Sequence, residues 1–158
     1  YKTAVLVGAA MKMGAIVANA SEKDCDAIYE FGKNLGIAFQ LQDDYLDAFG
    51  DPKSFGKQVG GDIIENKKTY LYLKALEFSN EQDSLELKRL FSSNPEDISA
   101  KIITAKQFFD SSGSAEATKF AIQDYTDKAF TVLESITISN DKKALLKDFG
   151  NSLMNRTV

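Results

Sequence analysis

The chain has 158 residues, 44% of them hydrophobic and 27% charged, a balance typical of one soluble domain and unlike that of a disordered chain. Its formal net charge is −4 and it contains no run of lysine or arginine, which argues against a nucleic-acid partner. With no histidine and one cysteine, it excludes imidazole chemistry, an intrachain disulfide and a CxxC zinc or redox site.

The whole chain is expected to be helical. Only two prolines occur, Pro52 and Pro95, and no stretch alternates polar and apolar residues over the length of a strand. The predicted fold class is all-α, a helical bundle. Seven helices are predicted, over residues 1–19, 21–49, 62–77, 82–91, 95–109, 114–136 and 141–156.

Local signals set the limits of these helices. Ser21 and Asp24 resemble a capping box at the start of the second helix, and Pro52 ends that helix. Residues 50–61 hold four glycines and two lysines, which predicts a basic loop. Pro95 is predicted at the first position of the fifth helix, where no backbone N–H is needed.

The start and the compartment can also be inferred from sequence. The first helix opens without a capping residue and without an initiator methionine, which predicts that the chain begins inside a helix of a longer protein. Tyr1 to Val5 lack the features of a signal peptide, and no apolar stretch approaches the roughly 20 residues of a membrane span. Because a single cysteine suits a reducing compartment, we expect a cytoplasmic protein with no transmembrane segment.

The second helix carries an acidic face. At 3.6 residues per turn, Gly36, Gln40, Asp43 and Asp47 lie on one side, with Asp44 beside them. In a cleft of effective dielectric near 20, two such carboxylates ~5 Å apart would repel by ~3 kcal/mol. A divalent cation with a preference for oxygen ligands, such as Mg²⁺ shared with a substrate's phosphates, would remove this repulsion.

A solvated acidic surface is the alternative interpretation, and for an isolated DDxxD sequence it is the better one. Here the neighbouring residues are apolar, among them Phe39, Leu41 and Leu46, so the helix is expected to be buried on its other sides. The basic loop that follows supplies Lys57, and the next helix supplies Lys67. Metal-binding acids followed by mobile cations suit a diphosphate ligand.

These segments together resemble the trans-polyprenyl diphosphate synthases. The FQxxDDxxD motif spans residues 39–47, and the GKxxGxDIxxxKxT motif spans residues 56–69 in the same register. Lys2 and Thr3 match the Lys-Thr pair of the family's preceding helix. The resemblance covers residues 1–75. Because no arginine pair follows Asp47, the motif corresponds to the second of the family's two aspartate-rich motifs, and the chain to the C-terminal half of the fold.

The resemblance implies the isoprenoid-synthase helical fold and a magnesium-dependent prenyltransferase. Such an enzyme condenses an allylic diphosphate head-to-tail with isopentenyl diphosphate, and a homodimer is expected. Diphosphate departs, an allylic cation forms, and the isopentenyl double bond attacks it. The implied metal ligands are Asp43, Asp44 and Asp47. The implied catalytic residues are Lys2, Thr3, Gln40, Lys57 and Lys67, and the three lysines among them are expected to bind the substrate diphosphate.

The same resemblance implies the domain organisation. Residues 1–158 are expected to form one all-helical piece, in which residues 1–75 bind metal and diphosphate and residues 76–158 supply C-terminal helices. Because the first aspartate motif is absent, the fragment alone is expected to be inactive.

Three alternatives stay open. A terpene cyclase or head-to-head condensing relative also uses aspartate-rich helices, although the motif at residues 56–69 speaks against it. A non-catalytic subunit of a prenyl synthase would keep the fold without the chemistry. A helical binding module is the third alternative, and only the register of the motifs argues against it.

Overall fold

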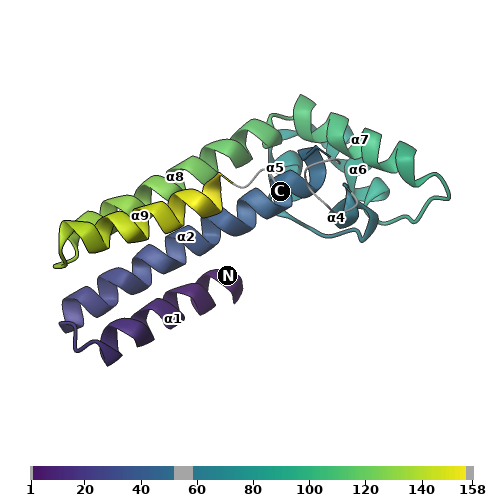
Figure 1. Cartoon of the computed structure of the whole chain (residues 1–158). Coiled ribbons are helices and arrows are strands. Elements are labelled where there is room, and N and C mark those ends of the chain that lie inside the picture. The colour runs from purple at the N-terminus through teal and green to yellow at the C-terminus, as the bar shows by residue number, and fades with distance from the viewer. Residues whose placement is uncertain (1, 52–58, 156–158) are drawn as a thin grey trace. The chain divides into compact units, whose positions relative to one another are not determined.

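The computed structural model describes residues 2–51 and 59–155 (Figure 1). Within these ranges the regular structure is entirely helical, which confirms the predicted all-α class. The helices are α1 (Lys2–Val17), α2 (Glu22–Phe49), α4 (Gly61–Ile64), α5 (Tyr70–Phe78), α6 (Glu81–Leu90), α7 (Ile98–Ser111), α8 (Ser114–Ser135) and α9 (Asn140–Met154). None of the described helices is both long and apolar enough to cross a membrane.

The chain divides into two compact units. The described part of the first unit is residues 2–40 and 121–155, and that of the second is residues 41–51 and 59–120. Helices α2 and α8 contribute residues to both units. The expected boundary at residue 75, between a part that binds metal and diphosphate and a part that supplies C-terminal helices, stays a prediction.

The first unit has a core made by three long helices. Phe31 and Leu35 of α2 are fully buried together with Ala129 and Leu133 of α8, and Leu146 of α9 packs on this cluster. Their spacing of three or four residues places each set on one face of its helix. Burial of this shared face therefore holds α2, α8 and α9 together.

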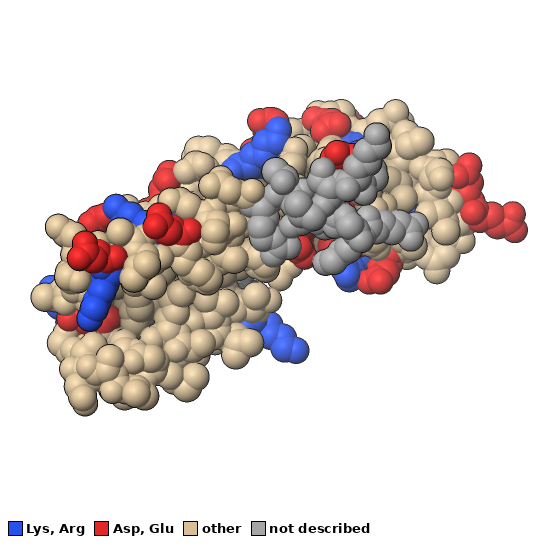
Figure 2. All heavy atoms as spheres, in the orientation of Figure 1, with Lys and Arg blue, Asp and Glu red and all other residues tan. Residues whose placement is uncertain are grey.

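Helix α1 lies beside α2 at close range (Figure 1). A Cβ atom on Gly36 would lie 2.8 Å from the Cα atom of Ala4, and one on Gly8 would lie 2.8 Å from the carbonyl oxygen of Tyr29. Glycine is therefore required at both positions for this packing. On its other side α1 exposes apolar side chains, including Leu6 and Val17, and its region is mostly uncharged in Figure 2.

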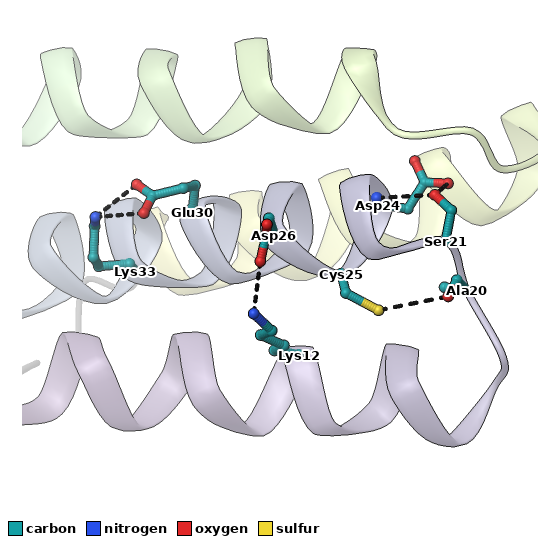
Figure 3. Close-up of polar contacts among 8 residues, drawn as sticks. All are labelled: Lys12, Ala20, Ser21, Asp24, Cys25, Asp26, Glu30 and Lys33. Atoms are coloured by element: carbon teal, nitrogen blue, oxygen red, sulfur yellow. Dashed lines mark hydrogen bonds and ion pairs between the residues drawn. The ribbon is translucent and has the colours of Figure 1, made fainter.

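The predicted pairing of Ser21 with Asp24 at the start of α2 is confirmed as an N-terminal cap (Figure 3). The Asp24 N–H donates to the Ser21 hydroxyl oxygen over 3.1 Å, and that hydroxyl donates to the Asp24 carboxylate over 2.8 Å. The same carboxylate accepts the Thr137 N–H at 2.9 Å, so one side chain serves the segment before α9 as well. This backbone hydrogen bond and the Ser21 hydroxyl lower the pKa of Asp24.

The second unit has an aromatic core under shorter helices. Tyr72 of α5 lies 4.6 Å from Phe91, ring centroid to centroid, and Phe91 lies 6.2 Å from Phe109 of α7. Ile63 of α4 and Leu87 of α6 are fully buried in the same cluster. The core therefore joins α4, α5, α6 and α7 to the end of α2, where Ala48 packs.

Two predicted helices differ from the structure, one by a break and one in its first residue. The single helix predicted over residues 62–77 is two helices, α4 and α5, because Asn66 adopts a left-handed backbone with φ 57° and ends the first. The helix predicted from Pro95 begins at Ile98, because the Asp97 carboxylate accepts the Ala100 N–H at 2.9 Å and caps it there. The described residues thus form eight helices, where seven were predicted.

Candidate functional site

The acidic residues of α2 adjoin the start of α4 in the second unit. Asp47 is the contact point: its carboxylate accepts the Asp62 N–H at 2.9 Å and its carbonyl oxygen accepts the Gly60 N–H at 2.6 Å. Gly60 has φ 85°, and a Cβ atom there would lie 2.8 Å from the Ile102 side chain. The glycine-rich sequence before α4 therefore allows its backbone N–H groups to reach Asp47.

Burial makes the charge of Asp47 unfavourable. The side chain is half-buried, and this desolvation raises its pKa; the Asp62 N–H opposes the shift, while the nearby Asp62 and Asp43 carboxylates add to it. A carboxylate in this position is stabilised by an added positive charge. Lys67 is one positive charge that already acts in this direction, since it lowers the pKa of Asp47.

Lys67 supplies one cation to this site. Its Nζ atom lies 2.6 Å from a carboxylate oxygen of Asp62 and 3.1 Å from one of Glu65. Hydrogen bonds to these two groups raise the pKa of Lys67, so the side chain is held in its charged form. Because the Lys67 side chain is 53% exposed, its ammonium group is accessible to a ligand.

A small hollow joins these groups. Its polar lining comes from Asp44, Asp47, Asp62, Lys67 and Thr69. Its apolar floor consists of Ala48, Ile63, Leu71, Phe91 and Phe109. The hollow therefore has a charged rim above the aromatic core of the second unit.

The first unit brings together two further predicted residues. The Thr3 hydroxyl of α1 donates a hydrogen bond to the side-chain oxygen of Gln40 in α2, over 3.2 Å. Lys2, the residue before Thr3, is exposed. Small residues make this contact possible, because the close approach of Gly36 and Ala4 brings the start of α1 to α2 one turn from Gln40.

The metal ligands stay a prediction. Among the described residues, no three or more carboxylate or thiol side chains are arranged to hold a metal ion. The donor chemistry nevertheless fits Mg²⁺, which usually takes one or two carboxylates and completes its shell with water and phosphate oxygens. Asp43, Asp44 and Asp47 offer such oxygens on one helix. The predicted Lys57 lies outside the described residues.

Sequence reasoning missed Asp62 and Glu65 as site residues. Asp62 belongs to the motif at residues 56–69, but its role as the link between Asp47 and Lys67 follows only from the fold. Its position at the first turn of α4, where backbone N–H groups are free, was the signal available. Glu65 carried no signal beyond its charge.

Comparison with known proteins gives one consistent result. The family model described as polyprenyl synthetase matches residues 1–107. The short chain isoprenyl diphosphate synthase of Methanothermobacter thermautotrophicus is 38% identical over 144 residues, which cover 91% of this chain and 43% of that protein.

Solved structures agree with this match. The crystal structure of a geranylgeranyl pyrophosphate synthase is 53% identical with a TM-score of 0.90, over 98% of this chain and 48% of that one. A polyprenyl synthase from Caulobacter crescentus CB15, complexed with calcium and isoprenyl diphosphate, is 33% identical with a TM-score of 0.84, over 98% and 47%. The chain thus spans a little under half the length of these relatives.

Proposed function

Because the chain belongs to the polyprenyl synthetase family, we propose that it forms the diphosphate-binding half of a prenyltransferase. The reaction proposed is the head-to-tail condensation of an allylic diphosphate with isopentenyl diphosphate. The observation that carries the proposal is the connected set of Asp47, Asp62 and Lys67, in which a half-buried carboxylate and an accessible ammonium group border one hollow.

Mg²⁺ fits this site as the cofactor. Asp43, Asp44 and Asp47 would hold it from α2, with oxygens of the allylic diphosphate in the remaining positions. When bound, Mg²⁺ would neutralise the diphosphate and make it a better leaving group. The raised pKa of Asp47 supports this assignment, because a group whose charge is disfavoured in the free protein gains most from a bound cation.

Lys67 is proposed to bind the diphosphate directly. In the free protein its ammonium group contacts Asp62, whose side chain is 18% exposed, and Glu65, whose side chain is 65% exposed. A diphosphate group carries more negative charge than a carboxylate, so the exposed side of the Lys67 ammonium group would bind it. As the bond between the allylic carbon and oxygen breaks, negative charge grows on the leaving diphosphate and Lys67, with Lys2 and Lys57, would stabilise it.

Thr3 and Gln40 are proposed to line the path of the allylic chain. The Thr3 hydroxyl donates to the side-chain oxygen of Gln40 and would orient this amide dipole toward a developing carbocation. Gln40 precedes Asp43 by one helical turn in α2. We also infer a homodimer in the cytoplasm, and the exposed apolar side chains of α1 support association.

The reaction itself tests the proposal. The chain is assayed alone and joined to the part of the Methanothermobacter enzyme that it does not match, with Mg²⁺, an allylic diphosphate and radiolabelled isopentenyl diphosphate. Labelled elongated product is expected from the joined protein and not from the chain alone.

Two results would contradict the proposal. One is a folded joined protein that binds Mg²⁺ and diphosphate but makes no product, which would favour a non-catalytic subunit. The other is product formation that persists after Asp43→Ala with Asp47→Ala. Circular dichroism of each protein shows whether it is folded, and the unaltered Methanothermobacter enzyme checks the assay.

A further inference from the structure

Lys101 in α7 is unusual because its charge is buried. Its exposure is 3%, and among the residues that the structure describes it is the only charged residue in the buried core. Its Nζ atom donates to the Asn66 side-chain oxygen at 2.7 Å and to the Ser93 carbonyl oxygen at 2.8 Å. Both acceptors are uncharged, and burial lowers the pKa of this lysine.

Stability alone is a weak reason to bury such a group. Removing an ammonium group from water is unfavourable, and neutral acceptors recover less of that free energy than a carboxylate would. Lys101 instead fixes the relative positions of two segments of the chain. It joins the turn between α4 and α5, through Asn66, to the segment after α6, through Ser93. Asn66 also donates to the Asn94 side-chain oxygen at 2.9 Å, which strengthens the same link.

The Asn66 turn determines where Lys67 leaves the backbone. Asn66 has φ 57°, a left-handed conformation that reverses the chain at the end of α4. Directly after it, the Lys67 N–H donates to the Asp62 carbonyl oxygen at 2.9 Å, and the Lys67 ammonium group reaches the Asp62 carboxylate at 2.6 Å. A turn released from Lys101 would carry Lys67 away from Asp62.

We propose that Lys101 is a positioning residue: acting through Asn66, it holds Lys67 beside Asp62, where the Lys67 ammonium group can contact a bound diphosphate. It does not touch the diphosphate itself, since its ammonium group is enclosed by Asn66 and Ser93. The inference rests on the proposed function, in which Lys67 contacts the diphosphate. It adds a residue that neither the family motifs at residues 39–47 and 56–69 nor the lining of the hollow includes.

A double-mutant cycle separates positioning from a merely structural role. Calorimetry measures the binding of inorganic diphosphate with Mg²⁺ to the full chain, to Lys67→Met, to Lys101→Met and to the double variant. Loss of one charge-assisted contact predicts roughly tenfold weaker binding for each single variant. Because both substitutions remove the same contact, the double variant should bind about as weakly as Lys67→Met alone.

Control variants exclude a general effect of charge or folding. Lys88→Met removes an exposed lysine of α6 and should leave binding unchanged, both alone and combined with Lys67→Met. Asn66→Gly keeps the left-handed turn accessible but removes both side-chain links, so it should weaken binding as Lys101→Met does. Asn66→Asp keeps an acceptor for Lys101 and should bind close to wild type.

Different results would contradict the positioning role of Lys101 and the proposed binding of diphosphate. If Lys67→Met weakens binding but Lys101→Met and Asn66→Gly bind as tightly as wild type, only the positioning role is overturned. If the wild-type chain does not bind diphosphate with Mg²⁺, or Lys67→Met has no effect, the proposed function fails and the positioning role fails with it. If Lys101→Met does not fold, Asn66→Gly against Asn66→Asp decides the question.

Discussion

The two units attach their irregular segments by different means. In the first unit the attachment is at the surface: the Asp24 carboxylate accepts the Thr137 N–H, and Glu134 pairs with Lys143 and Lys147. In the second unit a buried lysine, Lys101, holds the turn before α5. Water can replace a lost exposed contact but not a lost buried one. Breaking a polar contact should therefore disturb the second unit more than the first.

Loss of either core is expected to have the largest effect. Phe31→Ala in the first unit and Phe109→Ala in the second each remove a fully buried ring and should lower the free energy of unfolding by about 3–5 kcal/mol. Hydrogen exchange should show the loss of protection first in the unit that carries the substitution. Equal loss in both units after either substitution would show that the division into two units has no energetic meaning.

The contact between α1 and α2 gives the next largest effect. Gly36→Ala places a methyl group 2.8 Å from the Ala4 backbone, which cannot move without shifting α1, so unfolding should become easier by about 1–3 kcal/mol. The shift should also separate Thr3 from Gln40. Gly14→Ala is the matched control: no atom lies within 4 Å of the new methyl group. That variant should gain up to about 1 kcal/mol from helix propensity. Urea denaturation of both variants measures the difference, and equal effects would rule out the close packing.

The exposed cap of α2 should have a smaller effect. Ser21→Ala removes the hydroxyl that accepts the Asp24 N–H and should lower the free energy of unfolding by about 1 kcal/mol. Thermal denaturation against Ser111→Ala, which removes an exposed hydroxyl at the end of α7, gives the comparison. If Ser111→Ala costs as much as Ser21→Ala, the Ser21 cap has no special role.

The smallest predicted effect is a dependence of stability on acid pH. The Thr137 N–H and the Ser21 hydroxyl lower the pKa of Asp24 in the folded chain from its ordinary value of 3.8. A lowered carboxyl pKa stabilises the fold above the unfolded pKa, and this contribution is lost as pH falls through the folded pKa. Below about pH 4, the melting temperature of Asp24→Asn should therefore fall less steeply with pH than that of wild type. An unchanged slope would contradict the role of Asp24.

The features that could be predicted from sequence depend on residues close together in the chain, and those that could not depend on distant ones. The long helices α2 and α8, the Ser21 cap and the acidic face of α2 follow from residues near one another in the chain. The break at Asn66 was not predicted, and the side chains that hydrogen-bond to this turn, Lys101 and Asn94, lie about thirty residues away in sequence. The role of Asp62 was missed for the same reason, since its partner Asp47 lies 15 residues earlier in the chain.

Magnesium-dependent binding of diphosphate tests the central claim most directly. Calorimetric titration of the chain with inorganic diphosphate should give saturable binding with Mg²⁺ and none with EDTA. Asp43→Ala with Asp47→Ala should abolish the signal, whereas Asp110→Ala, at an exposed acid of α7, should leave it unchanged. Equal binding by the double variant and the wild-type chain would show that the acidic face of α2 is not the diphosphate site.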